Sequence, residues 1–156
     1  MSDQGWRRYQ FAKLIDMVDG DTCKVEIDHG FSLAHRVSIR LYGLSCPEIT
    51  GADKLLGQDA LRVARAIAWD QSVGAELLTD GVPCLLWTWK ASFSRYVGRV
   101  LLGGTVDVAR AIILAGYGHA WDGKTERRPF DRFPLTAPAL EEAAAYDRLL
   151  ARDFRP

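Results

Sequence analysis

The sequence predicts an α+β protein that is mainly β, built from five short strands and three helices. In several segments apolar and polar residues alternate with the period of a half-buried strand, as Val25 and Ile27 do among charged neighbours. In other segments apolar residues recur with the helical period, as at Leu61, Ala64 and Ala68. The predicted order is strand-strand-strand-helix-strand-strand-helix-helix. This order fits an OB-type barrel with three packed helices, or another α+β arrangement.

Three strands are expected in the first part of the chain. Residues 9–28 predict two strands around the turn V-D-G-D-T, and D-H-G-F at 28–31 supplies the next turn. The third strand is expected over 34–44. Its two faces carry Val37, Ile39 and Leu41 on one side, and Arg36, Ser38, Arg40 and Tyr42 on the other. Arg40 is therefore expected to point away from the apolar face, toward solvent or a cleft.

The remaining elements follow in the second part of the chain. A helix is expected over 57–71, and residues 72–83 fit either a short helical turn or a loop. Strands at 84–90 and 96–102 are joined by a turn around A-S-F-S. Asp107 is a plausible N-cap for a helix that Gly116 ends, because glycine readily adopts the left-handed conformation. After a loop near residues 129–138, a helix at 140–153 carries Ala143, Tyr146 and Leu150 on one stripe.

Composition predicts a single domain over residues 1–156. The 156 residues carry no net charge, so any anionic polymer must meet a local basic cluster. No segment approaches the roughly 18 apolar residues of a membrane span, and no signal peptide is seen, so we expect a cytoplasmic protein without a membrane partner. Cys23, Cys46 and Cys84 lack zinc-site spacing and are expected as buried free thiols.

Four motifs stand in order along residues 10–121, ahead of a C-terminal loop and helix at 122–156. They read V-D-G-D-T, I-R-L-Y-G-L-S-C-P-E, F-S-R-Y-V-G-R-V and V-D-V-A-R-A-I-I-L-A-G. Each motif alone is weak, because D-G-D-T is a common turn and an arginine within a strand is usually solvated. Together and in this order they resemble the staphylococcal-nuclease-like (thermonuclease) family. The resemblance implies an OB-type barrel and metal-assisted hydrolysis of DNA or RNA with little sequence specificity.

The resemblance also implies a role for individual residues. Asp21 matches a calcium-ligand aspartate, and the backbone carbonyl of Cys46 falls where a carbonyl faces the metal. Arg40 and Arg95 match phosphate-binding arginines, and Glu48 matches the glutamate that orients or deprotonates the attacking water. These residue types suit the reaction, because guanidinium groups grip phosphate oxygens, calcium prefers oxygen ligands and the water needs a carboxylate acceptor.

One departure from the family pattern concerns the metal. The family usually has an aspartate where this chain has Ser45, so we expect Ca²⁺ to be held weakly at Asp21, Ser45 and Cys46, with Mg²⁺ possible. Phe93 and Ser94 also replace a tyrosine and a glycine beside Arg95. The alternative to a nuclease is therefore a catalytically impaired relative that binds nucleic acid or a protein.

The segment after Gly116 carries candidate substrate contacts. Trp121 fits either a stacking surface for a base or a core residue, and both alternatives stay open. Lys124 belongs to a basic cluster with Arg127, Arg128 and Arg132, which would suit a nucleic-acid surface or a solvated loop. His119 is the histidine nearest the motifs, and we expect it to be incidental.

Overall fold

The centre of the fold is a closed barrel of five strands. The structure, a computed structural model, describes residues 5–70, 81–90, 96–130 and 138–155. The barrel consists of β1 (Arg7–Met17), β2 (Thr22–Asp28), β3 (Ala34–Leu41), β5 (Val82–Lys90) and β6 (Tyr96–Leu102). Neighbours in the order β3-β2-β1-β5-β6 pair antiparallel, and a parallel pairing of β3 with β6 closes the barrel. The prediction of a mainly β protein with five principal strands is confirmed.

The alternation of apolar residues explains how the strands close around a core. Each strand contributes at least one fully buried residue to this core, namely Leu14, Val25, Ile39, Leu86 and Val100. Their polar neighbours face outward, because successive side chains of a strand point to opposite faces. The long strand β1 pairs with both β2 and β5, and its register shifts along each pairing. Such irregularities bend a strand, which helps a sheet to close on itself.

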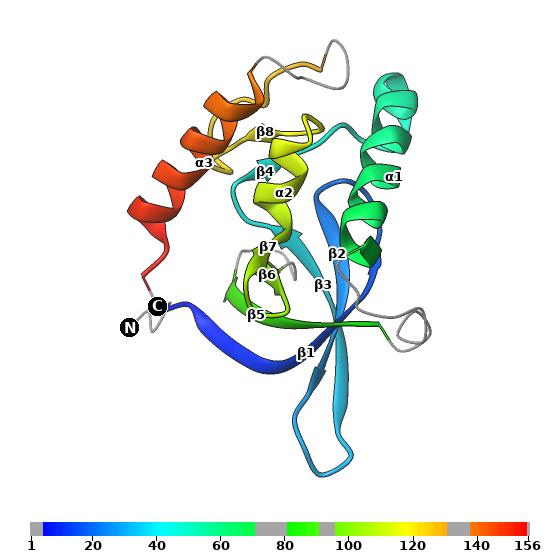
Figure 1. Cartoon of the computed structure of the whole chain (residues 1–156), viewed down its shortest axis with the longest axis vertical. Helices are drawn as coiled ribbons and strands as arrows, with labels where there is room; N and C mark the ends of the chain where they lie inside the picture. The colour runs from blue at the N-terminus through cyan, green and yellow to red at the C-terminus, as the bar shows by residue number, and fades with distance from the viewer. Residues whose placement is uncertain (1–4, 71–80, 91–95, 131–137, 156) are drawn as a thin grey trace.

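Three helices cover part of the barrel (Figure 1). They are α1 (Lys54–Asp70), α2 (Val108–Leu114) and α3 (Ala139–Asp153), and α2 packs against both of the others. On the expected apolar faces, Ala64 and Ala68 of α1 and Tyr146 of α3 are buried. Leu61 and Leu150 are half-buried and pack against the core. The expected cap of α2 is also present, because Asp107 Oδ1 accepts a hydrogen bond from Arg110 N at 3.3 Å.

Some boundaries differ from the prediction. The third strand was expected over 34–44 but divides into β3 and the short β4 (Leu44–Ser45), because Gly43 turns the chain with a φ of 77°. The first helix begins at Lys54, after the 3-10 turn η1 (Gly51–Asp53), earlier than expected. Most of the ambiguous segment 72–83 and the turn around A-S-F-S lie outside the described residues.

Two further expectations concern the cysteines and the membrane. Cys23, Cys46 and Cys84 are all buried free thiols, as predicted. Within the described residues, none of the helices is both long and apolar enough to cross a membrane.

A second, two-stranded sheet brings distant segments together above the barrel. It pairs β4 with β8 (His119–Ala120), and it places Leu44 opposite Ala120 and Ser45 opposite His119. The remaining short strand, β7 (Val106–Asp107), extends the barrel sheet beside β6. The β4–β8 pairing sets the chain after residue 120 beside the segment that ends in Glu48.

Candidate active site

Asp21 lies in the tight turn between β1 and β2. Asp19 Oδ1 accepts a hydrogen bond from Asp21 N at 3.0 Å, and Leu41 N donates to Asp21 O at 2.8 Å. Gly20 allows the turn to approach the chain after β4, because a Cβ at this position would lie 2.7 Å from Cys46 Cβ. The glycine of D-G-D-T thus has a structural role, which is to seat Asp21 against residues 45–48.

The carboxylate of Asp21 is buried, with the residue only 5% exposed. Its Oδ2 accepts a hydrogen bond from Cys46 N at 2.9 Å and lies 3.5 Å from Arg40 Nη2. Burial raises the pKa of Asp21 to about 6, because it penalises the charged form; Arg40 opposes this shift and Asp19 adds to it. A cation beside this carboxylate would stabilise its charged form.

Arg40 and Trp121 form one wall of the site. Arg40 lies on β3 opposite Thr22, and its guanidinium carbon is 5.0 Å from the centre of the Trp121 ring. Trp121 follows β8 directly, and its backbone N donates to Gly43 O at 2.9 Å. Guanidinium groups stack favourably on aromatic faces. The ring of Trp121 is half-buried and lies in the site, so it is not a simple core residue.

Glu48 lies at the outer edge of the site, after the buried Pro47. Its side chain is 59% exposed. The start of α1 packs against the backbone at this point, because a Cβ on Gly57 would lie 2.1 Å from Glu48 O. The helix therefore fixes the position of the Glu48 backbone, while the Glu48 carboxylate remains accessible to water.

Arg127 is the residue that the sequence analysis did not place in the site. Its Nε donates to Ser45 Oγ at 2.9 Å, its Nη1 to Glu48 Oε1 at 2.8 Å, and its Nη2 to the carbonyl oxygen of Cys46. The same Nη2 lies 3.6 Å from Asp21 Oδ2. One guanidinium thus joins the expected metal ligands to the expected general base.

The structure brings some of the predicted site residues together and places others elsewhere. The structure brings Asp21, Ser45 and Cys46 together with Arg40, and Glu48 joins them through Arg127. Arg95 and Arg132 lie outside the described residues. Lys124 is exposed in a turn beyond Trp121, where its charge acts on Asp153. His119 stacks on Phe130 with ring centres 4.8 Å apart, and no role in the chemistry is assigned to it.

The oxygens expected to hold calcium are already engaged. Asp21 Oδ2 and the Cys46 carbonyl face Arg127 Nη2, and Ser45 Oγ accepts from Arg127 Nε. Among the described residues, His, Cys, Asp and Glu side chains form no group of three that could hold a metal. This donor set does not fit a calcium ion while Arg127 lies there. Calcium binding stays a prediction.

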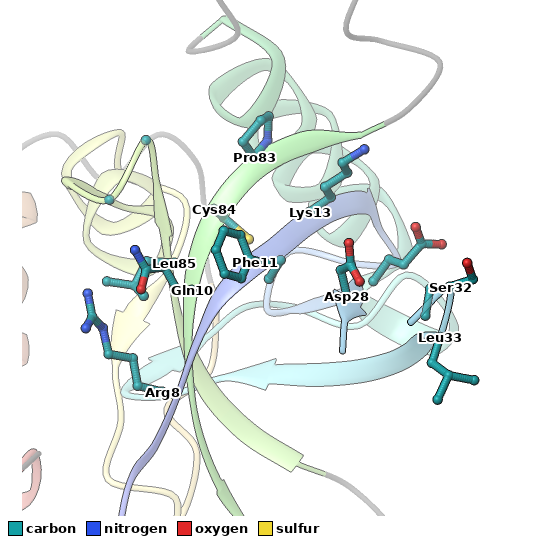
Figure 2. Close-up of a pocket in the computed structure, with 15 residues that line it drawn as sticks. Arg8, Gln10, Phe11, Lys13, Asp28, Ser32, Leu33, Pro83, Cys84 and Leu85 are labelled. Atoms are coloured by element: carbon teal, nitrogen blue, oxygen red, sulfur yellow. The ribbon is translucent and has the colours of Figure 1, made fainter. Parts of the chain in front are cut away.

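Two hollows lie outside this cluster. One, of about 440 Å³, borders Trp121 on the side of Thr125, Arg128 and Arg148. The other, of about 610 Å³, lies across β1, β5 and the β2–β3 hairpin (Figure 2). Its lining includes Arg8, Phe11 and Lys13 but none of the predicted site residues. The first hollow adjoins the site, and the second is separate from it.

Comparison with known proteins adds no relative. Neither the protein-family models nor the curated proteins include a match to the chain. Assignment of a function therefore depends on the motifs and on the geometry of the site.

Proposed function

We propose that this chain is a staphylococcal-nuclease-like protein with an OB-type barrel that binds and hydrolyses phosphodiester bonds of DNA or RNA. The observation that carries the proposal is the convergence of Asp21, Arg40 and Glu48 beside Trp121. Asp21 comes from the first motif, while Arg40 and Glu48 lie eight positions apart in the second. The three residues meet where the turn after β1, the end of β3 and the segment after β4 adjoin. The closed five-stranded barrel with three helices supports the same assignment.

Each residue has a task in this reaction. Arg40 is 21% exposed and would hold the non-bridging phosphate oxygens, on which charge builds as water attacks. The water oxygen forms a bond to phosphorus, one ester P–O bond breaks, and the leaving oxygen takes a proton from solvent. Glu48 accepts the proton from the water, for which its carboxylate is suitably exposed. Trp121 offers an aromatic surface on which a base could stack.

The resemblance implies calcium in addition. When bound, this ion would polarise the phosphate and the attacking water. It would be held by the oxygens of Asp21, Ser45 and Cys46, to which Arg127 is now bonded or adjacent. Hydrolysis with calcium therefore requires that Arg127 move away from them.

A second candidate is a domain that binds nucleic acid without cutting it. Two observations favour it: Ser45 stands in place of an aspartate, and Arg127 engages Glu48 at 2.8 Å. A carboxylate oxygen that already accepts a hydrogen bond from a guanidinium is less available to accept the proton of an attacking water. Phosphate binding by Arg40 would be kept in either case.

Binding and cleavage of labelled oligonucleotides test the proposal. We would follow fluorescein-labelled single-stranded DNA and RNA by polarisation and by gel, with Ca²⁺, with Mg²⁺ or with EDTA. Arg40→Ala is expected to weaken binding and to lower cleavage by on the order of 10². The matched control is Arg36→Ala, because Arg36 lies on the same face of β3 but pairs with Glu26.

The outcomes separate the two candidates. Cleavage that Arg40→Ala removes and Arg36→Ala retains supports the enzyme. Binding with the same dependence on Arg40, but without cleavage under any condition, supports the binding domain. If the wild-type chain neither binds nor cuts, or if both variants behave alike, the proposed function is wrong.

A further inference from the structure

All three guanidinium nitrogens of Arg127 donate hydrogen bonds to acceptor groups of the site. Nε bonds to the hydroxyl of Ser45, Nη1 to the carboxylate of Glu48, and Nη2 to the carbonyl of Cys46 while lying 3.6 Å from Asp21 Oδ2. The acceptors are a hydroxyl, a carbonyl and two carboxylates. A hard divalent cation seeks the same groups. The guanidinium therefore lies where these oxygens would enclose such an ion.

Two arginines offset most of the negative charge of the site. Asp21 and Glu48 supply two negative charges, and Arg40 and Arg127 supply two positive ones within ion-pair distance. Asp19 adds a third negative charge beside Asp21, so the excess is a single charge. A divalent ion added beside Arg127 would meet its positive charge at close range. So small an excess does not favour tight binding of calcium, which depends on the number of charged ligands.

Ser45 and Arg127 are complementary as hydrogen-bond acceptor and donor. Ser45 is 2% exposed, and its hydroxyl accepts the Nε proton of Arg127 at 2.9 Å. A serine provides this acceptor without adding a buried negative charge. The absence of a carboxylate at residue 45 and the presence of a guanidinium from residue 127 are therefore two parts of one arrangement.

The loop that carries Arg127 is fixed at several points. Trp121 Nε1 donates to Thr125 O at 2.8 Å, and Asp122 Oδ1 accepts from Thr125 N at 2.8 Å. The next residue, Arg128, forms two hydrogen bonds of 2.7 Å with the carboxylate of Glu142 on α3. The Trp121 ring also faces the Arg127 guanidinium at 5.7 Å. These contacts hold the backbone on both sides of Arg127, so its position is built into the fold.

We propose that Arg127 takes the place of a divalent cation in this site, so that the wild-type chain binds no Ca²⁺ there. If Arg127 replaces the ion, contact with a phosphodiester does not require a divalent cation. Only this consequence rests on the proposed function. We also expect that Ser45→Asp alone gains no calcium affinity, because Arg127 would pair with the new carboxylate. Affinity appears when Arg127 is removed.

Terbium luminescence measures the ion directly. Tb³⁺ binds calcium sites, and the Trp121 ring is near enough to the Arg127 position to sensitise its emission. We would titrate Tb³⁺, and Ca²⁺ by calorimetry, into the wild-type chain, Ser45→Asp, Arg127→Ala and the double variant Ser45→Asp/Arg127→Ala. The matched control is Arg62→Ala, which removes the same charge from an exposed ion pair on α1.

We expect no sensitised emission from the wild-type chain, from Ser45→Asp or from Arg62→Ala. Arg127→Ala should gain binding, and the double variant should bind at least tenfold more tightly than the wild-type chain. Adding Asp21→Asn to the double variant should abolish the gain, which locates the ion. Circular dichroism confirms that each variant is folded.

Two results would overturn the inference. In the first, the wild-type chain binds Tb³⁺ or Ca²⁺ as tightly as Arg127→Ala; in the second, neither Arg127→Ala nor the double variant gains binding. The oligonucleotide assay tests the proposed function separately. If that function is wrong, the chain neither binds nor cleaves the oligonucleotides, whatever the terbium titration shows.

Discussion

Replacing Glu142 by alanine tests how firmly the loop of Arg127 is anchored. Glu142 is 8% exposed, and its carboxylate accepts two hydrogen bonds of 2.7 Å from Arg128 and one of 2.8 Å from Ala120 N. Glu142→Ala removes all three. It leaves Ala120 N without its acceptor and returns Arg128, whose side chain is 54% exposed, to water.

The expected loss follows from these contacts. A part-buried amide without an acceptor costs about 1–3 kcal/mol. The ion pair with the exposed Arg128 adds at most about 1 kcal/mol after solvent screening. We expect the free energy of unfolding to fall by about 2–3 kcal/mol, which lowers the Tm of a chain of this size by about 4–12 °C. Glu142→Gln keeps an acceptor for Ala120 N and should lose about half as much.

Thermal unfolding followed by circular dichroism measures the effect. The control is Glu141→Ala, because Glu141 is the exposed neighbour on the same turn and should change the free energy of unfolding by less than about 0.5 kcal/mol. Equal Tm values for Glu142→Ala and Glu141→Ala would refute the reasoning that Glu142 anchors the loop.

Three further predictions concern acid, the approach of α1 and the stacking wall. Burial opposes ionisation of Glu142, but the hydrogen bonds from Arg128 and Ala120 N outweigh burial and lower the pKa of Glu142. The ionised carboxylate therefore stabilises the fold above the unfolded-state pKa, and this stabilisation is lost as pH falls through the lowered folded-state pKa. The Tm of Glu142→Gln should fall less steeply below about pH 5 than the Tm of the wild-type chain. Gly57→Ala places a Cβ 2.1 Å from a backbone oxygen and should cost about 1–3 kcal/mol in urea unfolding, and an unchanged midpoint would contradict this. Trp121→Ala should weaken oligonucleotide binding about tenfold in a polarisation titration, since a stacked base is worth about 1–3 kcal/mol, and unaltered affinity would remove Trp121 from the binding surface.

Much of the barrel could be predicted because its strands have one buried face. The alternation around Val25 and Ile39 reports that face directly, and both residues are fully buried. The meeting of Asp21 with Arg40 was also foreseeable, because the ordered motifs imply it. The split of the third strand was not, because a single glycine at residue 43 turns a chain that otherwise continues the pattern.

Arg127 could not be placed from the sequence, for a physical reason. It contacts Ser45 across 82 positions, and that contact depends on the pairing of β4 with β8, which are two residues long each. Strands of this length leave no periodicity to detect. The available signals were the basic run after Trp121 and the missing carboxylate at Ser45, and only their contact in the fold connects them.

In the proposed function, the end of the barrel around Arg40 receives a phosphodiester. Side-chain Nε–H resonances in ¹⁵N NMR test it most directly, during titration with a short single-stranded oligonucleotide in EDTA. We expect the Arg40 resonance to shift with the oligonucleotide concentration, while the resonance of Arg36, on the same strand, stays in place. A titration in which Arg40 does not move, or in which the shifts gather at Arg8 in the hollow of Figure 2, would contradict it.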